Sequence, residues 1–197
     1  MKTGIFGGAF NPVHIGHIAL ARNYLKELSL DRIIFIPTAV PPHKSGAEFA
    51  SADSRFNMLS LAIGDNKSFE ISDIEYKREG KSYTFYTLCQ LKALYPEDEF
   101  YLIIGSDQFL YFNNWYRAQE ICEMATLCTA ARNAYELKAL ERFREDNAYL
   151  KNAVITDFDV IELSSSEIRK KLKNGESISG LVPQKVEQYI KEKGLYV

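Results

Sequence analysis

A glycine-rich stretch near the start of the chain, GGAFNPVHIGH, carries two histidines three residues apart. It begins with Gly7 and Gly8, which follow a short apolar run, and a backbone without side chains lets a ligand come close. His14 and His17 are expected on one face of a helix start, because residues three apart in a helix are neighbours. Gly16 lies at the same helix start, whose N–H groups favour an anion. The stretch therefore predicts a phosphate cradle with two imidazole donors.

Two other interpretations of this stretch remain open. An H-x-x-H pair can bind a metal, but the third histidine of the chain, His43, lies in a predicted loop, so no complete ligand set is evident. The two histidines can also be structural. Neither the G-x-G-x-x-G dinucleotide pattern nor the G-K-[ST] of a P-loop fits the stretch. We therefore expect no resident metal and favour contact with phosphate.

Two further motifs could serve the same anion. PPHK places Lys44 on a loop stiffened by two prolines, where its point charge could meet a phosphate or simply be solvated. SSSEIRKKLK places Ser165, Ser166 and Arg169 at a helix start, where hydroxyls, free amides and a guanidinium could reach the same ligand. A Ser-x-x-Glu capping box would explain this second motif equally well without a ligand.

An aromatic segment, GSDQFLYFNNW, follows the strongest central-strand pattern of the chain at its carboxyl end. Asp107 could bind sugar hydroxyls or assist a cation. Tyr111, Phe112 or Trp115, the sole tryptophan, could stack on a planar ring. Aromatic residues at this spacing are also common in hydrophobic cores, so the segment alone leaves both interpretations open.

The elements that must position these residues alternate along the chain. Apolar runs predict strands at 3–6, 32–38, 69–76, 99–105, 124–131 and 152–158. Helical spacing and end signals predict helices at 16–28, from an N-cap at Asp53 to about Ile63, at 84–94, 134–150, 164–175, and from Pro183 to about Gly194. Consecutive prolines predict a loop at 39–46, and we interpret 41–51 as a site loop rather than a domain boundary.

Strands that alternate with helices predict an α/β fold with a doubly wound, Rossmann-like parallel sheet. We expect a single domain over residues 1–197, with a small helical C-terminal part at about 164–197. Ligands of such sheets bind beyond the carboxyl ends of the strands. Both the glycine-rich stretch and the aromatic segment follow predicted strands at these ends.

Composition narrows the class of protein. The formal net charge is −2, from 26 acidic and 24 basic residues, which argues against a nucleic-acid or anionic-membrane surface. There is no apolar stretch of the roughly 20 residues that a membrane span needs, and no signal-peptide pattern, so we expect a cytoplasmic protein. Three cysteines without a C-x-x-C pair argue against a disulfide framework or a zinc knuckle. The oligomeric state is left open, and a homo-oligomer is compatible with the sequence.

Taken in order, these motifs resemble a known enzyme superfamily. GGAFNPVHIGH matches the G-x-F-x-P-x-H-x-G-H signature of nucleotidyltransferases that transfer adenylyl or cytidylyl groups, and SSSEIR matches their second signature, I-S-S-T-x-I-R. PPHK, ISDIEYKREGKSYTFYTL, IIGSDQFLYFNNW and GLVPQKVEQYIKEKGLY are similar to segments of the bacterial nicotinate-nucleotide adenylyltransferases. The resemblance extends from residue 2 to the end of the chain.

The resemblance implies a reaction. The 5′-phosphate of nicotinate mononucleotide would attack the α-phosphorus of ATP, giving nicotinate adenine dinucleotide and pyrophosphate for NAD biosynthesis. Mg²⁺ would be carried on the ATP phosphates. The attacking phosphate is already an anion, so catalysis would consist of positioning and charge stabilisation by His14, His17, Lys44 and Arg169.

The resemblance also implies two sets of binding residues. Those expected to bind ATP are Gly7, Gly8, Phe10, His14, Gly16, His17, Gly105, Asp107, Arg132, Ser165, Ser166 and Arg169. Those expected to bind nicotinate mononucleotide are Ala9, Lys44, Thr84, Phe85, Tyr111 and Trp115. In the second set, the nicotinate ring would stack on Trp115, and its carboxylate would meet backbone N–H groups near Thr84 and Phe85 at a helix start.

Some positions depart from the family pattern, and other classes of protein share parts of it. Ser166 replaces the usual threonine but keeps a hydroxyl, and Leu163 conservatively replaces isoleucine. SISGLVP lacks the basic-aromatic pair that often precedes the proline. Phosphopantetheine adenylyltransferases and cytidylyltransferases share the first signature without PPHK and SYTFYTL. Class I aminoacyl-tRNA synthetases would need a K-M-S-K-S motif, which is absent. A nucleotide-binding or redox-sensing module without turnover is the non-enzymatic alternative.

Overall fold

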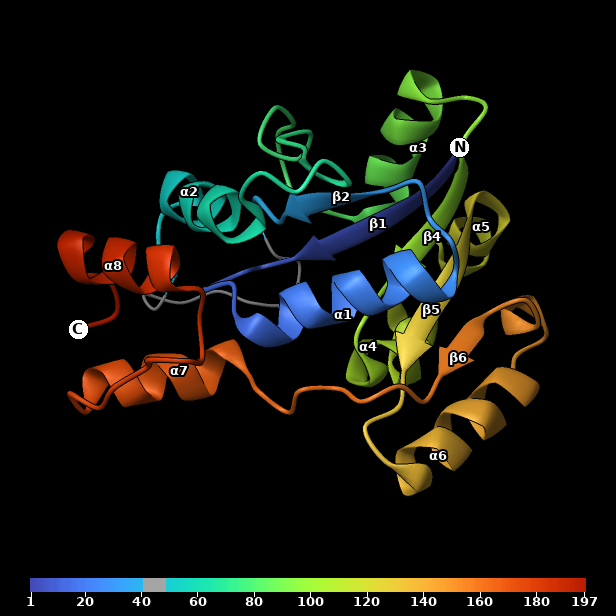
Figure 1. The fold of residues 1–197 in the computed structure, drawn as a ribbon. Helices are drawn as coiled ribbons and strands as arrows, with labels where there is room; N and C mark the ends of the chain where they lie inside the picture. Colours follow the sequence, from blue (N-terminus) through green and yellow to red (C-terminus); the bar gives the residue numbers. More distant parts are fainter. Residues whose placement is uncertain (41–48) are drawn as a thin grey trace.

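A six-stranded parallel sheet forms the centre of the protein in the computed structural model, which describes residues 1–40 and 49–197 (Figure 1). The strand order is β3-β2-β1-β4-β5-β6. The strands are β1 (Lys2–Gly8), β2 (Arg32–Pro37), β3 (Phe69–Ile71), β4 (Glu99–Ile103), β5 (Ala125–Ala130) and β6 (Val154–Thr156). The order reverses between β1 and β4, the position at which doubly wound sheets bind ligands. The predicted Rossmann-like α/β fold is confirmed.

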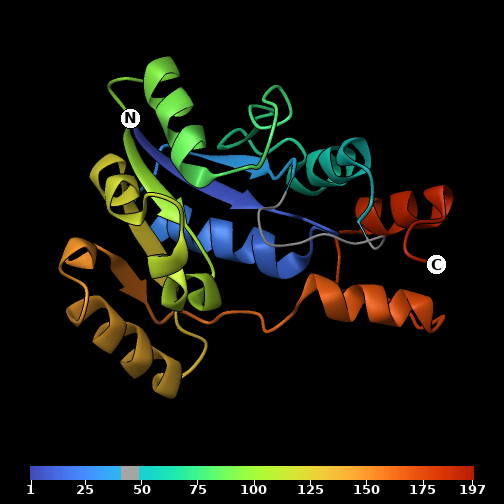
Figure 2. The ribbon, with the colours of Figure 1, turned by 180° about the vertical axis from the view of Figure 1, so that it is seen from behind.

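Helices cover both faces of the sheet (Figures 1 and 2). On one side lie α1 (Ile15–Glu27), α2 (Ala52–Ile63), α7 (Ser165–Lys173) and α8 (Gln184–Lys193). On the other lie α3 (Thr84–Leu94), α4 (Ser106–Leu110), α5 (Ala118–Met124) and α6 (Ala134–Glu145), with the short 3₁₀ helices η1 (Phe112–Asn114) and η2 (Ala148–Leu150). The sheet is therefore buried on both sides, which explains its continuous apolar runs.

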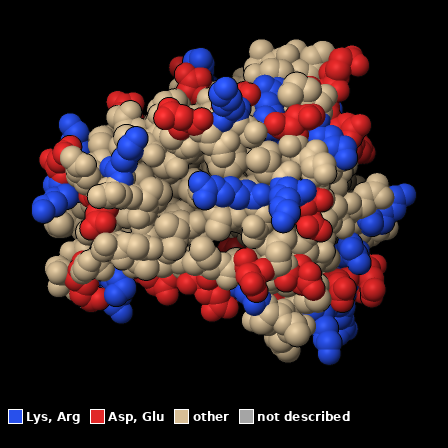
Figure 3. All heavy atoms as spheres, viewed as in Figure 1, with Lys and Arg blue, Asp and Glu red and all other residues tan. Residues whose placement is uncertain are grey.

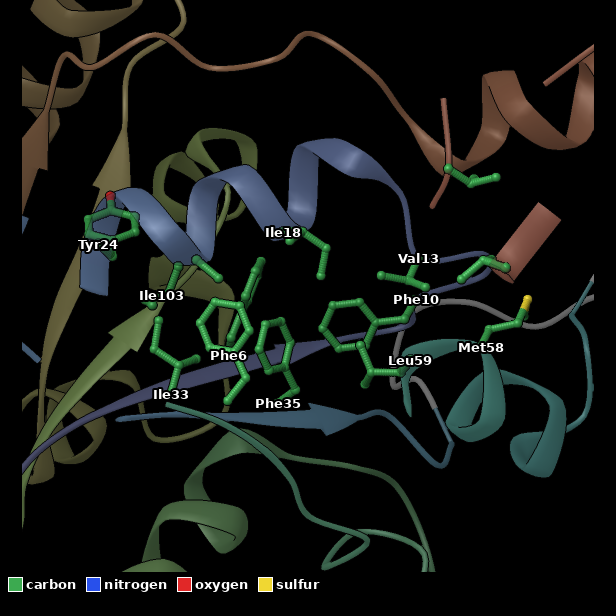
Figure 4. Close-up of a cluster of buried hydrophobic side chains, with 14 of the residues drawn as sticks. Phe6, Phe10, Val13, Ile18, Tyr24, Ile33, Phe35, Met58, Leu59 and Ile103 are labelled. Atoms are coloured by element: carbon green, nitrogen blue, oxygen red, sulfur yellow. The ribbon is translucent and has the colours of Figure 1, made fainter. Parts of the chain in front are cut away.

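Alternate residues of β1, β2, β4, β5 and β6 fill two separate hydrophobic cores. In β2, Ile33 and Phe35 belong to the core beneath α1 and α2, whereas Ile34 and Ile36 belong to the core beneath α3. Figure 4 shows the first core, in which Phe10 from the turn after β1 packs close to Leu59 of α2. Buried residues of α7 and α8 contribute to this same core, so the C-terminal helices pack against the sheet domain.

The structure corrects several predicted boundaries in the first half of the chain. The predicted strand 69–76 ends at Ile71, because the chain then turns and the Tyr76 amide donates to the Asp73 carbonyl at 2.8 Å. Asp53 is not the N-cap of α2. Ser51 is, and its hydroxyl accepts from the Ser54 amide at 3.1 Å.

Further corrections concern the second half. The predicted strand 99–105 ends at Ile103, and the predicted strand 124–131 begins one residue later, because α5 extends to Met124. The predicted helix 134–150 divides into α6 and η2, and the predicted strand 152–158 shortens to β6. The short helices α4, of five residues, and α5, of seven, do not follow from the sequence pattern, because helices of this length depend on tertiary packing.

The surface carries charges of both signs. Figure 3 shows basic and acidic side chains interspersed over the face on which α1 lies. Within residues 1–40 and 49–197, there is no helix with the length and apolar character needed to cross a membrane.

Candidate active site

The turn between β1 and α1 brings the two histidines together. His14 is the N-cap of α1, and its backbone amide donates to Nδ1 of His17 at 3.2 Å. The two imidazole rings stack with their centroids 3.6 Å apart, and the edge of Phe10 meets the His17 ring at 5.1 Å. Because Nδ1 of His17 accepts a hydrogen bond, the proton of the neutral ring is assigned to Nε2. The predicted neighbourhood of the two rings is thus formed.

Both imidazoles are neutral near pH 7. Burial lowers the pKa of His14 to about 4, partly opposed by the nearby carboxylate of Glu167. Burial also lowers the pKa of His17 well below its ordinary value, and the adjacent His14 adds to this effect. The pair can therefore donate hydrogen bonds to an anion without carrying a fixed positive charge.

A cavity of about 990 Å³ opens above these histidines. It lies beyond the carboxyl ends of β1, β4 and β5 and reaches to the start of α7. Eleven of the residues that were expected to bind ATP line it: Gly7, Phe10, His14, Gly16, His17, Gly105, Asp107, Arg132, Ser165, Ser166 and Arg169. We call it the larger cavity.

The start of α7 is bound to the turn after β1. The Ser165 hydroxyl donates to the Pro12 carbonyl at 2.8 Å. The guanidinium of Arg169 donates to the Asn11 carbonyl at 2.8 Å and to the Ser166 hydroxyl at 3.2 Å. The alternative capping box of Ser164 and Glu167 is also formed, so a capped helix and a cavity-lining helix start coexist in the same segment.

A second cavity of about 310 Å³ lies on the α3 side of the sheet edge. Its lining includes Gly8, Thr84 and Trp115, together with apolar residues of β1 and β4 at its base. The ring of Phe112 packs against Trp115, with ring centroids 5.1 Å apart. We call this the smaller cavity. It contains a flat aromatic surface and the first residue of α3.

The two cavities share a wall. Gly7, Ala9, Ile104, Gly105 and Asp107 line both of them. These residues lie at or just after the carboxyl ends of β1 and β4, the two strands between which the strand order reverses. A C-beta added to Gly7 would meet no atom within 4 Å, so the wall is open at that residue. Two ligands, one in each cavity, would therefore meet here.

Three of the predicted site residues lie apart from both cavities or outside the described chain. Tyr111 is 46% exposed and lines neither cavity. The Phe85 ring is buried beneath the guanidinium of Arg117, 4.0 Å from the ring centroid, so only the Phe85 backbone in the first turn of α3 lies near the smaller cavity. Lys44 falls outside the described residues. Its predicted role stays a prediction.

Comparisons with known proteins agree with this architecture. A model of the cytidylyltransferase-like family matches residues 5–171. A protein of Geobacillus thermodenitrificans named as a probable nicotinate-nucleotide adenylyltransferase is 40% identical over 202 residues, covering 99% of this chain and 86% of the relative. A protein of the same name from Oceanobacillus iheyensis is 42% identical over 195 residues, covering 99% and 96%.

The chain belongs to the nicotinate-nucleotide adenylyltransferase family. The fold is also similar to that of nicotinic acid mononucleotide adenylyltransferase from Plasmodium falciparum, solved in complex with NaAD. That similarity has a TM-score of 0.77 at 22% identity and covers 100% of this chain and 98% of the other.

In this member of the nicotinate-nucleotide adenylyltransferase family, Arg55 supports the site without belonging to a motif. Its side chain is 2% exposed, and its guanidinium donates to the carbonyls of Ala9 at 3.0 Å and Thr38 at 2.7 Å. A further bond reaches the Ala50 carbonyl at 3.3 Å. Arg55 thus joins the turns after β1 and β2. The only sequence signal for it is an arginine at the apolar face of a helix, beside Met58 and Leu59.

Glu136 is a second residue that sequence motifs did not reveal. Its carboxylate accepts from the Ser106 hydroxyl at 2.7 Å and from the Arg132 backbone amide at 2.6 Å. It lines the larger cavity on the side of β5, which β4 separates from β1 and the histidines that follow it. Glu136 therefore joins the segments after β4 and β5 around one end of that cavity.

Within residues 1–40 and 49–197, no group of three His, Cys, Asp or Glu side chains is placed to hold a metal ion. The three cysteines are unpaired.

Proposed function

We propose that the protein transfers the adenylyl group of MgATP to the 5′-phosphate of nicotinate mononucleotide, yielding nicotinate adenine dinucleotide and pyrophosphate. The observation that carries the proposal is the wall that the two cavities share at Gly7, Gly105 and Asp107. Transfer between two bound nucleotides requires their reacting phosphates to meet, and occupants of the two cavities would touch at this wall. The names of the relatives supply the identity of the nucleotides.

ATP is assigned to the larger cavity. The end near His14, His17 and Arg169 offers hydrogen-bond donors and a permanent positive charge, which suit a polyphosphate. The opposite end, near Arg132 and Glu136, is left for the nucleoside half. Lys44, which belongs to the undescribed segment, would supply a second positive charge to the leaving pyrophosphate.

Nicotinate mononucleotide is assigned to the smaller cavity. Trp115 offers a ring face on which a pyridine can stack. The first turn of α3, at Thr84 and Phe85, offers backbone N–H groups that have no partner within the helix and suit the nicotinate carboxylate. The nucleotide phosphate would then point to the shared wall. Tyr111 is not needed in this assignment.

The chemistry requires no general base. The attacking phosphate oxygen is already anionic, so a bond forms between it and the α-phosphorus while the bond to the β-phosphate oxygen breaks and pyrophosphate leaves. His14 and His17 donate neutral hydrogen bonds to the charge that develops on the transferred group, and Arg169 adds its positive charge. The protein thus acts by positioning and by donors that are fixed before the substrates arrive.

Mg²⁺ enters with ATP as part of the substrate and neutralises phosphate charge there. Asp107, a carboxylate of the shared wall, suits a contact with this ion through water. The proposed location is the cytoplasm, where unpaired cysteines remain reduced.

The direct test incubates the protein with ATP, Mg²⁺ and nicotinate mononucleotide, and measures pyrophosphate together with the dinucleotide product. We expect both products in equal amounts, and none without Mg²⁺. The His17→Ala variant is expected to lose about 10²-fold in kcat, because it lacks a donor to the transition state. Binding of both nucleotides without any product would indicate a nucleotide-binding module rather than an enzyme. A wild-type rate in His17→Ala would refute the role of His17 as a donor to the phosphate.

The assignment of the smaller cavity has a separate test. Nicotinate and nicotinamide mononucleotides differ only in a carboxylate against an amide, so N–H donors at the start of α3 should favour the acid. We expect a higher kcat/KM for nicotinate mononucleotide. Equal values for the two substrates would refute the role of Thr84 and Phe85.

A further inference from the structure

Asn11 is bound from three sides within the phosphate-cradle turn. The residue is 1% exposed. Its side-chain oxygen accepts from the Tyr196 hydroxyl at 2.6 Å and from the Ala50 amide at 3.0 Å. Its backbone carbonyl accepts from the guanidinium of Arg169 at 2.8 Å. Asn11 therefore connects the segment before α2, the Arg169 side chain on α7 and the turn after α8.

Tyr196 reaches this point from the turn that follows α8. Its ring packs against the core beneath α1 and α2. Burial raises the pKa of the Tyr196 hydroxyl above its ordinary value, so the hydroxyl remains protonated and donates its hydrogen bond. A buried acceptor such as the Asn11 amide oxygen is costly to leave without donors.

The C-terminal elements meet the cradle at other points as well. The Ser165 hydroxyl donates to the Pro12 carbonyl at 2.8 Å, and the Ile15 amide donates to the Leu181 carbonyl at 3.1 Å. With Tyr196 and Arg169, these bonds attach α7, the loop before α8 and the turn after α8 to the residues between β1 and α1. The position of Arg169 consequently depends on where the Asn11 carbonyl is held.

We propose that Tyr196 is a positioning residue for adenylyl transfer: its hydroxyl fixes Asn11, and the Asn11 carbonyl in turn fixes the guanidinium of Arg169 at the larger cavity. Tyr196 does not line either cavity and acts only through Asn11. The inference rests on the proposed function, because its readout is the rate of that reaction.

The test substitutes Tyr196→Phe, which removes one hydroxyl and keeps the ring. We expect kcat to fall about tenfold, with the KM for nicotinate mononucleotide unchanged, because Arg169 acts at the larger cavity. Tyr189→Phe is the matched control. Tyr189 lies on α8, and its hydroxyl accepts from Asn57 at 3.3 Å without reaching the cradle, so this variant should keep the wild-type kcat.

A double-mutant cycle with Arg169→Ala separates positioning from a general loss of packing. If Tyr196 acts through Arg169, adding Tyr196→Phe to Arg169→Ala should change kcat less than twofold. Where turnover of Arg169→Ala is too slow, the dissociation constant for a non-hydrolysable MgATP analogue completes the same cycle. Equal effects of Tyr196→Phe in both backgrounds, or an unchanged kcat in the single variant, would overturn the proposal. An inactive wild-type protein would instead overturn the proposed function.

Discussion

At the scale of single residues, the two histidines of the cradle have a protonation state that their sequence pattern does not determine. The sequence pattern predicts two imidazole donors but leaves the charge of the two rings open. Burial keeps both rings neutral, and the His14 amide fixes which nitrogen of His17 carries the proton. The sequence predicts that the two histidines lie together at the helix start, whereas their protonation follows from burial, which no spacing reveals.

The neutral histidines make stability depend on pH. The pKa of His14 is about 4 in the folded protein and about 6.5 when unfolded. As pH falls from about 6.5 towards 4, the unfolded chain binds a proton that the folded chain does not, so the free energy of unfolding decreases. It is restored above about 6.5. At pH 5, His14 alone should cost about 2 kcal/mol.

This dependence is measured by denaturant unfolding at pH 7 and pH 5, without nucleotides. His14→Gln carries no titratable ring and should show a smaller decrease between the two pH values than the wild type. A wild-type protein that is equally stable at both values would contradict the neutral assignment.

Gly7 should be needed for ligands and not for folding. A C-beta at this residue meets nothing within 4 Å, yet the residue lines both cavities. Gly7→Ala should therefore keep the wild-type melting temperature and raise the KM values of the substrates about tenfold by obstructing the shared wall.

Gly16→Ala is the contrasting variant. Its added C-beta would lie 3.1 Å from Nδ1 of His14 and 3.2 Å from the Ile161 carbonyl. It should lower both the melting temperature and kcat, because either His14 or the backbone must shift. A Gly7→Ala protein that melts early would show that this glycine serves the fold after all.

At the scale of elements, the site depends on side chains that join neighbouring segments. The strands and the longer helices follow from apolar periodicity, and 84–94 is predicted with the bounds that α3 has. The helices α4 and α5 do not follow from it, because short helices are stabilised by tertiary packing rather than by their own pattern. The hydrogen bonds made by Arg55 and Glu136 could not be predicted from the sequence either, because they join segments far apart in the chain.

Replacing Glu136 should change the KM for only one of the two substrates. The Glu136 carboxylate has two acceptor oxygens, one for the Ser106 hydroxyl and one for the Arg132 amide. In Glu136→Gln, an NH₂ group replaces one of these oxygens, so one of the two donors loses its acceptor. The segments after β4 and β5 should then move apart at the part of the larger cavity that we assign to the nucleoside. We expect the KM for MgATP to rise about three- to tenfold with the KM for nicotinate mononucleotide unchanged.

Steady-state kinetics with each substrate varied in turn measures this effect. Glu141→Gln, on the same helix and outside both cavities, is the control and should match the wild type. Equal increases in both KM values would indicate a general loosening of the sheet edge.

At the scale of the whole molecule, the two cavities and a network of polar and charged side chains lie at opposite ends of the sheet. The carboxyl ends of the strands carry the cavities. The opposite end carries a polar network in which Asp98 accepts from the Thr3 hydroxyl at 2.7 Å and from Arg32 at 3.0 Å. Arg32 also pairs with Glu70 at 3.1 Å. This network joins β1, β2, β3 and the residue that precedes β4, without contacting either cavity.

Asp98→Asn should therefore reduce stability and leave catalysis unchanged. Hydrogen bonds from Thr3 and Arg32 hold the pKa of Asp98 below its ordinary value against the effect of burial, so the carboxylate is charged in the folded protein. Losing that charge should cost about 1.5–3 kcal/mol of unfolding free energy at pH 7. The test pairs urea unfolding with kcat/KM for both substrates. A lower kcat/KM in a variant that is fully folded under the assay conditions would mean that the two ends of the sheet are coupled.

The shared wall has a consequence for the end of the reaction cycle. A dinucleotide that spans both cavities makes the contacts of two ligands but loses the translational and rotational entropy of only one molecule. The product should therefore remain bound longer than either substrate. Compounds built to bridge Gly7 and Gly105 would exploit the same advantage and act as bisubstrate inhibitors with long residence times.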